Sequence, residues 1–205
     1  MTAFWLVLMG YLIGSIPIAY LAARLRGHDL LDEGAGGVSG SAAIERLGPV
    51  PGAAAGFLDA LKPVLVVAVA QRFESYDVSA AAGVAAVGGH IWPITLRWRG
   101  GRGIGPAGAL LAALGAWQMC LAFAGLVLGR ALLRDSAPGA LVGFFATAVL
   151  LSLTGQSLTI GVTAWVVVGV VVVGRLVGYR KVRTEEDVGL ARLMVRRLIL
   201  DRDER

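Results

Sequence analysis

Long apolar stretches separated by short polar segments dominate this chain. The stretches of membrane-spanning length cover residues 4–25, 104–133, 139–154 and 160–177. About 20 apolar residues of helix cross the hydrocarbon core of a bilayer, and 57% of the chain is hydrophobic. The pattern therefore predicts an all-α polytopic membrane protein. No basic residue precedes the first stretch, and Gly10, Ser15 and Pro17 interrupt it, so we expect a retained span and not a signal peptide.

The placement of charge orients the predicted spans. Residues 1–23 hold no basic side chain, whereas basic residues recur in the segments 24–48, 97–103 and 130–137 and after Gly178. Basic segments favour the cytoplasmic side of a membrane. We therefore expect a multi-pass protein of the cell (plasma) membrane with its N-terminus outside and its glycine-rich loops in the cytoplasm.

The apolar segment 104–133 has basic residues at both ends, so we expect it to enter the membrane and return to the same side. It is too short for two full spans of about 20 residues each, and Gly115 is the expected breaking point. The pattern thus predicts seven transmembrane segments, one or two of them short. They lie at about 4–24, 50–70, 79–97, 104–114, 116–133, 138–154 and 158–178.

The end of the chain is its most basic part. We expect residues 1–183 to form a membrane-embedded domain and residues 184–205 to form a basic amphipathic cytoplasmic tail helix. Thr184 can cap that helix, and its apolar stripe consists of Leu190, Leu193, Met194 and Leu198. Such a helix either lies on the membrane surface or packs under the bundle.

Composition excludes several classes of site. Nine of the 19 basic residues lie at or after Arg175, and in a membrane protein this asymmetry points to anionic lipid and not to nucleic acid. Cys120 is the single cysteine, so no internal disulfide forms. His28 and His90 are far apart in sequence, and we expect no metal site.

Ionisable groups inside predicted spans are costly, so each one is a candidate for function. Asp59 and Lys62 are three residues apart and share one helical face, where they can form an ion pair. The pair either presents an ammonium to a cytoplasm-facing cleft or is structural, with Lys62 reaching towards the interface. His90, between two glycines and Pro93, is either a hydrogen-bonding or basic group or a satisfied core residue.

The segment RGGRGIGPAG, residues 99–108, is a candidate anion-binding loop. Its glycines allow successive backbone amides to point inward, and a helix that begins near Ile104 would direct its positive end at the loop. Arg102 adds a fixed charge with bidentate geometry. The alternative is a flexible loop whose arginines only set the topology.

A second glycine-rich loop, residues 32–48, is predicted on the same side of the membrane. Ser39 and Ser41 supply its hydroxyls, and Glu33, Glu45 and Arg46 are its nearby charges. Two such loops on one membrane face suggest a shared anionic ligand.

These segments together resemble the bacterial acyl-phosphate:glycerol-3-phosphate acyltransferases, the PlsY family of small membrane enzymes with seven helices. LDALK is similar to the second motif of that family, and GHIWPITLRWRGGRGIG is similar to its third, with Arg99 and Arg102 in place of Lys. The resemblance implies acyl transfer from acyl-phosphate to glycerol 3-phosphate, giving lysophosphatidic acid for phospholipid synthesis. It implies no metal and no cofactor, and a third-motif loop that binds phosphate.

The first motif departs from the family. Where the family has Ser, Asn, Asn and Arg, this chain has Ala35, Gly37, Ala42 and Glu45. Arg46 is adjacent to the last of these, but one step along a helix turns a side chain by about 100°. The chain contains no Asn, and the residue after Lys62 is Pro63 where the family has Gly.

We therefore expect a divergent acyltransferase whose acceptor is glycerol 3-phosphate or another small alcohol. The expected catalytic residues are Lys62, His90 and Arg102, and the expected substrate-binding residues are Gly34, Gly36, Ser39, Ser41, Arg46, Asp59, Gly100, Gly101, Gly103, Ile104 and Gly105. One alternative is a non-catalytic paralogue that binds anionic lipid or partners another membrane enzyme. A small transporter or channel is disfavoured, because the spans lack paired half-helix repeats.

Overall fold

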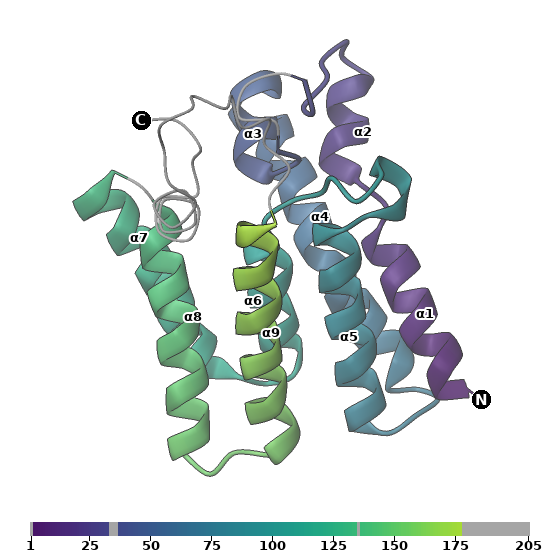
Figure 1. The fold of residues 1–205 in the computed structure, drawn as a ribbon, viewed down its shortest axis with the longest axis vertical. Coiled ribbons are helices and arrows are strands. Elements are labelled where there is room, and N and C mark those ends of the chain that lie inside the picture. The colour runs from purple at the N-terminus through teal and green to yellow at the C-terminus, as the bar shows by residue number, and fades with distance from the viewer. Residues whose placement is uncertain (1, 33–36, 135, 178–205) are drawn as a thin grey trace.

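The computed structural model describes residues 2–32, 37–134 and 136–177, and in that part of the chain the regular structure is entirely helical (Figure 1). The helices are α1 (Thr2–Gly14), α2 (Ile18–Arg24), α3 (Gly40–Leu47), α4 (Pro49–Ala70), α5 (Tyr76–Ile91), α6 (Ile104–Ala113), α7 (Cys120–Leu133), α8 (Ser136–Leu153) and α9 (Leu158–Leu176). Two 3₁₀ turns are η1 (Ile94–Leu96) and η2 (Trp117–Met119). The predicted tail helix, residues 184–205, lies outside the described residues.

Five helical segments are long and apolar enough to cross a membrane, and two further apolar helices are shorter. The five are Thr2–Arg24, Pro49–Ala70, Tyr76–Leu96, Ser136–Leu153 and Leu158–Leu176, and the shorter ones are Ile104–Ala113 and Trp117–Leu133. The prediction of an all-α membrane protein is confirmed for the described residues.

The first span is broken into α1 and α2, a feature that the sequence pattern did not predict. Pro17, whose backbone has no amide hydrogen, stands between the two helices. The amides of Ser15 and Ile16 still donate backwards to carbonyls of α1. The carbonyls at the end of α1 and the first amides of α2 therefore need partners from outside the span.

The turn between α6 and α7 occurs where it was expected. Gly115 has a φ of +78°, a left-handed conformation that glycine adopts without steric cost. Its amide and that of Ala116 donate back to carbonyls of α6, which closes the helix end. In Figure 1 the connecting segment lies in the lower half of the molecule, with α6 beside α9 and α7 beside α8.

Small residues bring α1 into backbone contact with α5. A β-carbon added to Gly10 would lie 2.3 Å from the carbonyl oxygen of Ala82, and one added to Gly14 would lie 2.1 Å from that of Ala86. Such close approach is typical of helix pairs in lipid, where packing replaces the hydrophobic effect. It places the break after α1 next to the C-terminal end of α5, where His90 lies.

Candidate active site

An ion pair on α4 holds the break in the first span. Lys62 Nζ lies 2.7 Å from Asp59 Oδ1, and both residues are buried, with 5% and 3% exposure. The same ammonium donates to the carbonyl oxygens of Gly14 at 2.7 Å and Ile16 at 2.6 Å. Lys62 is thus an interior residue whose charge does not reach the surface.

The Asp59 carboxylate serves the other side of the break. Its Oδ1 accepts the amide of Ile18 at 3.2 Å and its Oδ2 accepts the amide of Ala19 at 2.9 Å. These are the first two amides of α2, so the carboxylate caps that helix. Asp59 and Lys62 together satisfy backbone groups on both sides of Pro17.

His90 lies beside this pair at the end of α5. His90 is buried, with 9% exposure, and its Nδ1 is 3.9 Å from Asp59 Oδ1, too far for a direct hydrogen bond. Its other ring nitrogen, Nε2, faces Gly101, where an added β-carbon would lie only 2.2 Å away. The imidazole therefore lies between the buried carboxylate and the glycine-rich loop.

The glycine-rich loop is fixed to the end of α5 by its own amides. Gly100 donates to the carbonyl of Ile91 at 3.2 Å, and Gly101 donates to the carbonyl of His90 at 3.0 Å. These bonds satisfy two carbonyls that α5 leaves open at its C-terminus. The amides of Gly100 and Gly101 thus hold the loop in place, and the anion-binding amides have to come from further along it.

Those further amides belong to the N-terminal end of α6. Gly103 (φ +76°), Ile104 and Gly105 form no amide hydrogen bond within the described residues, and Pro106 has no amide to satisfy. Three amides at the positive end of a helix favour an anion. Arg102, which precedes them and is half-buried, adds a guanidinium. This end of the loop has the chemistry of a phosphate-binding site.

The first glycine-rich loop meets the second one at Gly101. A β-carbon on Gly101 would lie 2.5 Å from the carbonyl oxygen of Val38. Ser39 caps α3 by accepting the amide of Ala42 at 3.2 Å, and its hydroxyl is 3.1 Å from that of Ser41. The two glycine-rich loops, which were predicted to lie on the same side of the membrane, thus approach each other at Gly101. Gly34 and Gly36 lie outside the described residues.

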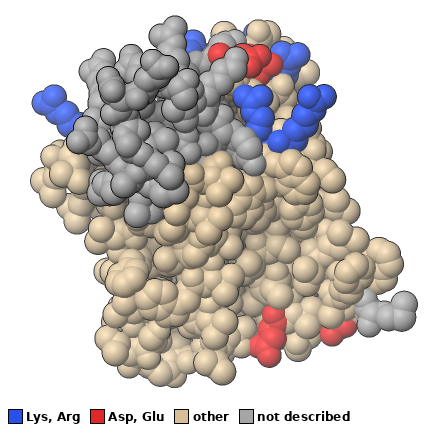
Figure 2. All heavy atoms as spheres, viewed as in Figure 1, with Lys and Arg blue, Asp and Glu red and all other residues tan. Residues whose placement is uncertain are grey.

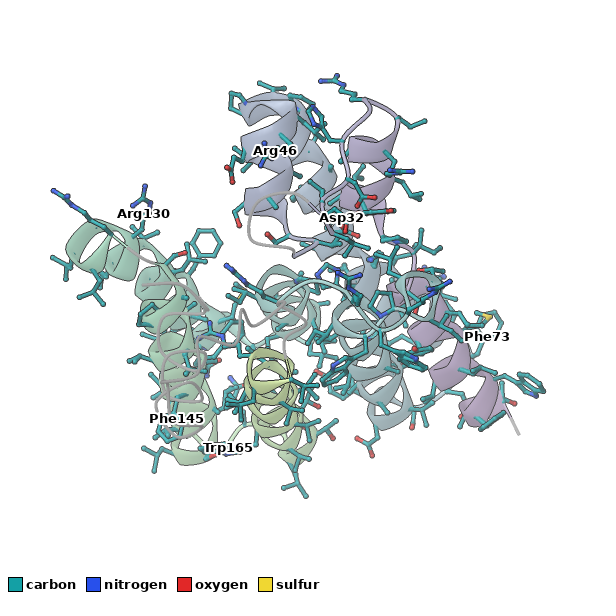
Figure 3. The ribbon with its side chains drawn as sticks, turned by 45° about the horizontal axis from the view of Figure 1, so that its top comes forward. Asp32, Arg46, Phe73, Arg130, Phe145 and Trp165 are labelled. Atoms are coloured by element: carbon teal, nitrogen blue, oxygen red, sulfur yellow. The ribbon has the colours of Figure 1, made fainter. Side chains whose placement is uncertain are left out.

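Helix α3 presents its two adjacent charges differently. Arg46 is half-buried between the buried residues Ala43 and Leu47, whereas Glu45 is exposed. Figure 3 shows Arg46 on α3 at the same end of the bundle as Asp32 and Arg130. The arginine, and not the glutamate, lies on the packed side of the helix.

Sequence reasoning missed two residues that tie the loop region to the first span. Thr95 Oγ1 donates to the carbonyl of Ser15 at 2.6 Å, and the Tyr11 hydroxyl donates to the carbonyl of Trp92 at 2.8 Å. For each residue the only local signal was a hydroxyl within an apolar stretch, and the carbonyl that accepts from each hydroxyl is distant in sequence. Among the described residues, no group of three His, Cys, Asp or Glu side chains could hold a metal ion.

The sequence of this chain is similar to that of known acyltransferases. A family model described as glycerol-3-phosphate acyltransferase matches residues 4–183. The chain is 38% identical over 128 residues to the glycerol-3-phosphate acyltransferase of Parasynechococcus marenigrum (strain WH8102), covering 62% of this chain and 60% of that protein. It is 41% identical over 112 residues to glycerol-3-phosphate acyltransferase 2 of Moorella thermoacetica, covering 53% and 58%. The match thus spans about 60% of the length of these curated relatives.

Solved structures match over more of the chain. The glycerol 3-phosphate form of PlsY (YgiH), an integral membrane glycerol 3-phosphate acyltransferase, superposes with a TM-score of 0.78 at 25% identity, covering 85% of this chain and 88% of PlsY. The lysophosphatidic acid form of the same protein has a TM-score of 0.74 at 24% identity and shows the same fold.

Proposed function

Because the chain belongs to the glycerol-3-phosphate acyltransferase family, we propose that it is a membrane enzyme that transfers an acyl group from acyl-phosphate to glycerol 3-phosphate. The product is lysophosphatidic acid, an intermediate of phospholipid synthesis. The observation that carries the proposal is the contact of both glycine-rich loops at Gly101, directly over His90.

The phosphate of acyl-phosphate binds at the start of α6 in this proposal. The amides of Gly103, Ile104 and Gly105 supply hydrogen bonds, and Arg102 balances the charge. Donors that are already fixed in position stabilise charge as it develops on a leaving group, without reorganisation during the reaction. The leaving phosphate gains charge in this step, so the same groups serve binding and catalysis.

The acceptor hydroxyl binds on the other side of the loop contact. His90 polarises the hydroxyl, and Ser39 and Ser41 orient the acceptor from the first loop. The hydroxyl oxygen forms the new bond to the acyl carbon, the acyl carbon–phosphate oxygen bond breaks, and the hydroxyl proton ends on the released phosphate. No metal, cofactor or covalent acyl-enzyme enters this scheme.

We place the active site at the cytoplasmic side of the membrane. Figure 2 shows Lys and Arg side chains gathered at the upper end of the molecule, whereas the charged side chains at the lower end are acidic in this view. The N-terminus lies at the lower end in Figure 1, away from the glycine-rich loops. The positive-inside rule then puts the N-terminus outside. In this proposal the five long spans and the two shorter apolar helices are the seven transmembrane segments.

The test is acyl transfer by the purified full-length chain in detergent. With palmitoyl-phosphate and labelled glycerol 3-phosphate we expect labelled lysophosphatidate. Arg102→Ala should lower kcat/KM by about 100-fold or more, since the loss of one charge-stabilising donor costs about 3 kcal/mol. Arg130→Ala, at an exposed arginine near the end of α7, is the matched control and should stay within about twofold of the wild type.

Two results would contradict the proposal. Binding of palmitoyl-phosphate without transfer to glycerol 3-phosphate or any other small alcohol would favour a non-catalytic protein that binds anionic lipid. Equal loss of activity in Arg102→Ala and Arg130→Ala would show that Arg102 acts only through the general positive charge of this end of the molecule.

A further inference from the structure

We infer that Asp59 and Lys62 are positioning residues, which join the two halves of the broken first span to α4 and leave substrate contact to the loops. The inference rests on the proposed function, because positioning is read out through acyl transfer. It assigns the buried charge pair of α4 a role distinct from that of Arg102, which balances the phosphate charge in the proposed function.

The break exposes more backbone groups than a continuous helix would. The carbonyls of Gly14, Ser15 and Ile16 and the amides of Ile18 and Ala19 all lie at the interruption, and all five are bound by side chains of other elements. A backbone group in the hydrocarbon region has no water to bind, so each must be satisfied within the protein. Three side chains, those of Asp59, Lys62 and Thr95, satisfy all five.

The hydrogen-bonding capacity of Lys62 is fully used by this task. An ammonium has three donors and no acceptor, and Lys62 Nζ has three oxygen partners at 2.6–2.7 Å. A substrate phosphate at this ammonium would have to replace one of the two carbonyls or the carboxylate. The displaced group would then be buried without a partner, which is costly.

The break in the first span contacts elements that lead to both glycine-rich loops. Helix α2 begins at the Asp59 carboxylate and leads into the first glycine-rich loop, where Val38 contacts Gly101. Thr95 ties the segment before the second loop to the carbonyl of Ser15. A shift at the break therefore moves both loops relative to His90. We expect loss of the pair to lower the rate of the chemical step more than it weakens binding.

The experiment is a double-mutant cycle on the full-length chain in detergent, with Lys62→Met, Asp59→Asn and the double variant. Each protein is assayed for apparent Tm and for kcat and KM with palmitoyl-phosphate and glycerol 3-phosphate. Lys62→Met leaves a buried carboxylate uncompensated and should lower Tm by about 10 °C. The double variant has no unpaired charge and should have a higher Tm than Lys62→Met.

The kinetic result separates positioning from a purely structural role. Misplacement of reacting groups by about 1 Å costs about 100-fold in rate, so kcat of Lys62→Met should fall by about that factor while each KM changes by less than about threefold. Thr147→Val is the matched control, because it removes a buried hydroxyl of α8 that donates to the carbonyls of Gln118 in η2 and Gly143 in α8. It should lower Tm but leave kcat unchanged at a temperature where all variants are folded.

Other outcomes would overturn the inference. A Lys62→Met variant with the wild-type Tm and a raised KM for either substrate would make Lys62 a substrate ligand. Additive effects of the two substitutions on Tm would show that the pair is not coupled. If the wild-type protein makes no lysophosphatidate, the proposed function fails, whereas the Tm cycle still decides whether the pair holds the break.

Discussion

Gly101 offers the sharpest perturbation of the proposed site, because it is the point where the two loops and His90 touch. A methyl group added by Gly101→Ala would lie 2.2 Å from His90 Nε2 and 2.5 Å from the carbonyl oxygen of Val38. Its position has no left-handed φ, so the substitution acts through contact and not through backbone strain.

The size of the effect follows from these distances. Carbon and heteroatoms are in favourable contact at about 3.5 Å, so the imidazole and the Val38 carbonyl must each move by about 1 Å. The carbonyl is backbone and His90 is almost fully buried, so neither moves freely. Overpacking of this kind costs about 1–3 kcal/mol of stability, and a 1 Å displacement of a reacting group costs about 100-fold in rate.

The assay compares Gly101→Ala with Gly88→Ala in one preparation, by apparent Tm and by lysophosphatidate formation. Gly88 is on α5, two residues before His90, and nothing lies within 4 Å of a β-carbon added there. Alanine in a helix is favoured over glycine by about 0.5–1 kcal/mol, so Gly88→Ala should keep full activity and gain a little stability. Gly101→Ala should lose about 100-fold in kcat.

The reasoning fails if Gly101→Ala is as active and as stable as Gly88→Ala. That result would mean that the loop is not seated on His90 in the working protein. The imidazole would then be one of many buried side chains, and the observation that carries the proposed function would be lost.

Two further substitutions test the packing that holds the site. Gly14→Ala places a methyl group 2.1 Å from the backbone oxygen of Ala86. It should therefore lower the apparent Tm by about 3–10 °C in a thermal scan. An unchanged Tm would contradict the close contact between α1 and α5. Gly115→Ala puts a β-carbon at a φ of +78°, which costs about 1–2 kcal/mol of stability. The variant should therefore have a Tm lower by a few degrees and a kcat at the wild-type level. A large loss of kcat would show that this turn takes part in the reaction.

The sequence predicted most of the helical fold because the signals for it are local. Spans follow from the length of apolar stretches, and the α6–α7 turn follows from a glycine in a segment too short for two full spans. The break in the first span did not follow, although Ser15 and Pro17 were visible as interruptions. A break is stable in a membrane only when its backbone groups find partners, and those partners, Asp59, Lys62 and Thr95, lie about 40 to 80 residues away.

The sequence proposed the members of the candidate site, but it did not predict the hydrogen bonds of the glycine-rich loop. Sequence reasoning brought the two glycine-rich loops together and included His90, and the contacts of Gly101 agree with that grouping. It also expected the amides of Gly100 and Gly101 to face an anion, but these donate to carbonyls at the end of α5. Which amides remain free depends on how the loop docks, and the residue types in the loop do not determine that.

The exposure of Glu45 and Arg46 on α3 bears on whether the proposed acceptor can carry a phosphate. By the resemblance to the family, Glu45 occupies the position of an arginine, which on sequence grounds sets like charge against a phosphate. In the structure that carboxylate is exposed, and the 100° step to the next residue turns Arg46 towards the packed side of α3. The rotation that separates Arg46 from the position of the lost arginine is the same rotation that leaves Glu45 exposed to solvent. The exposed carboxylate of Glu45 therefore does not by itself argue against an acceptor that carries a phosphate, which the proposed function places beside Ser39 and Ser41.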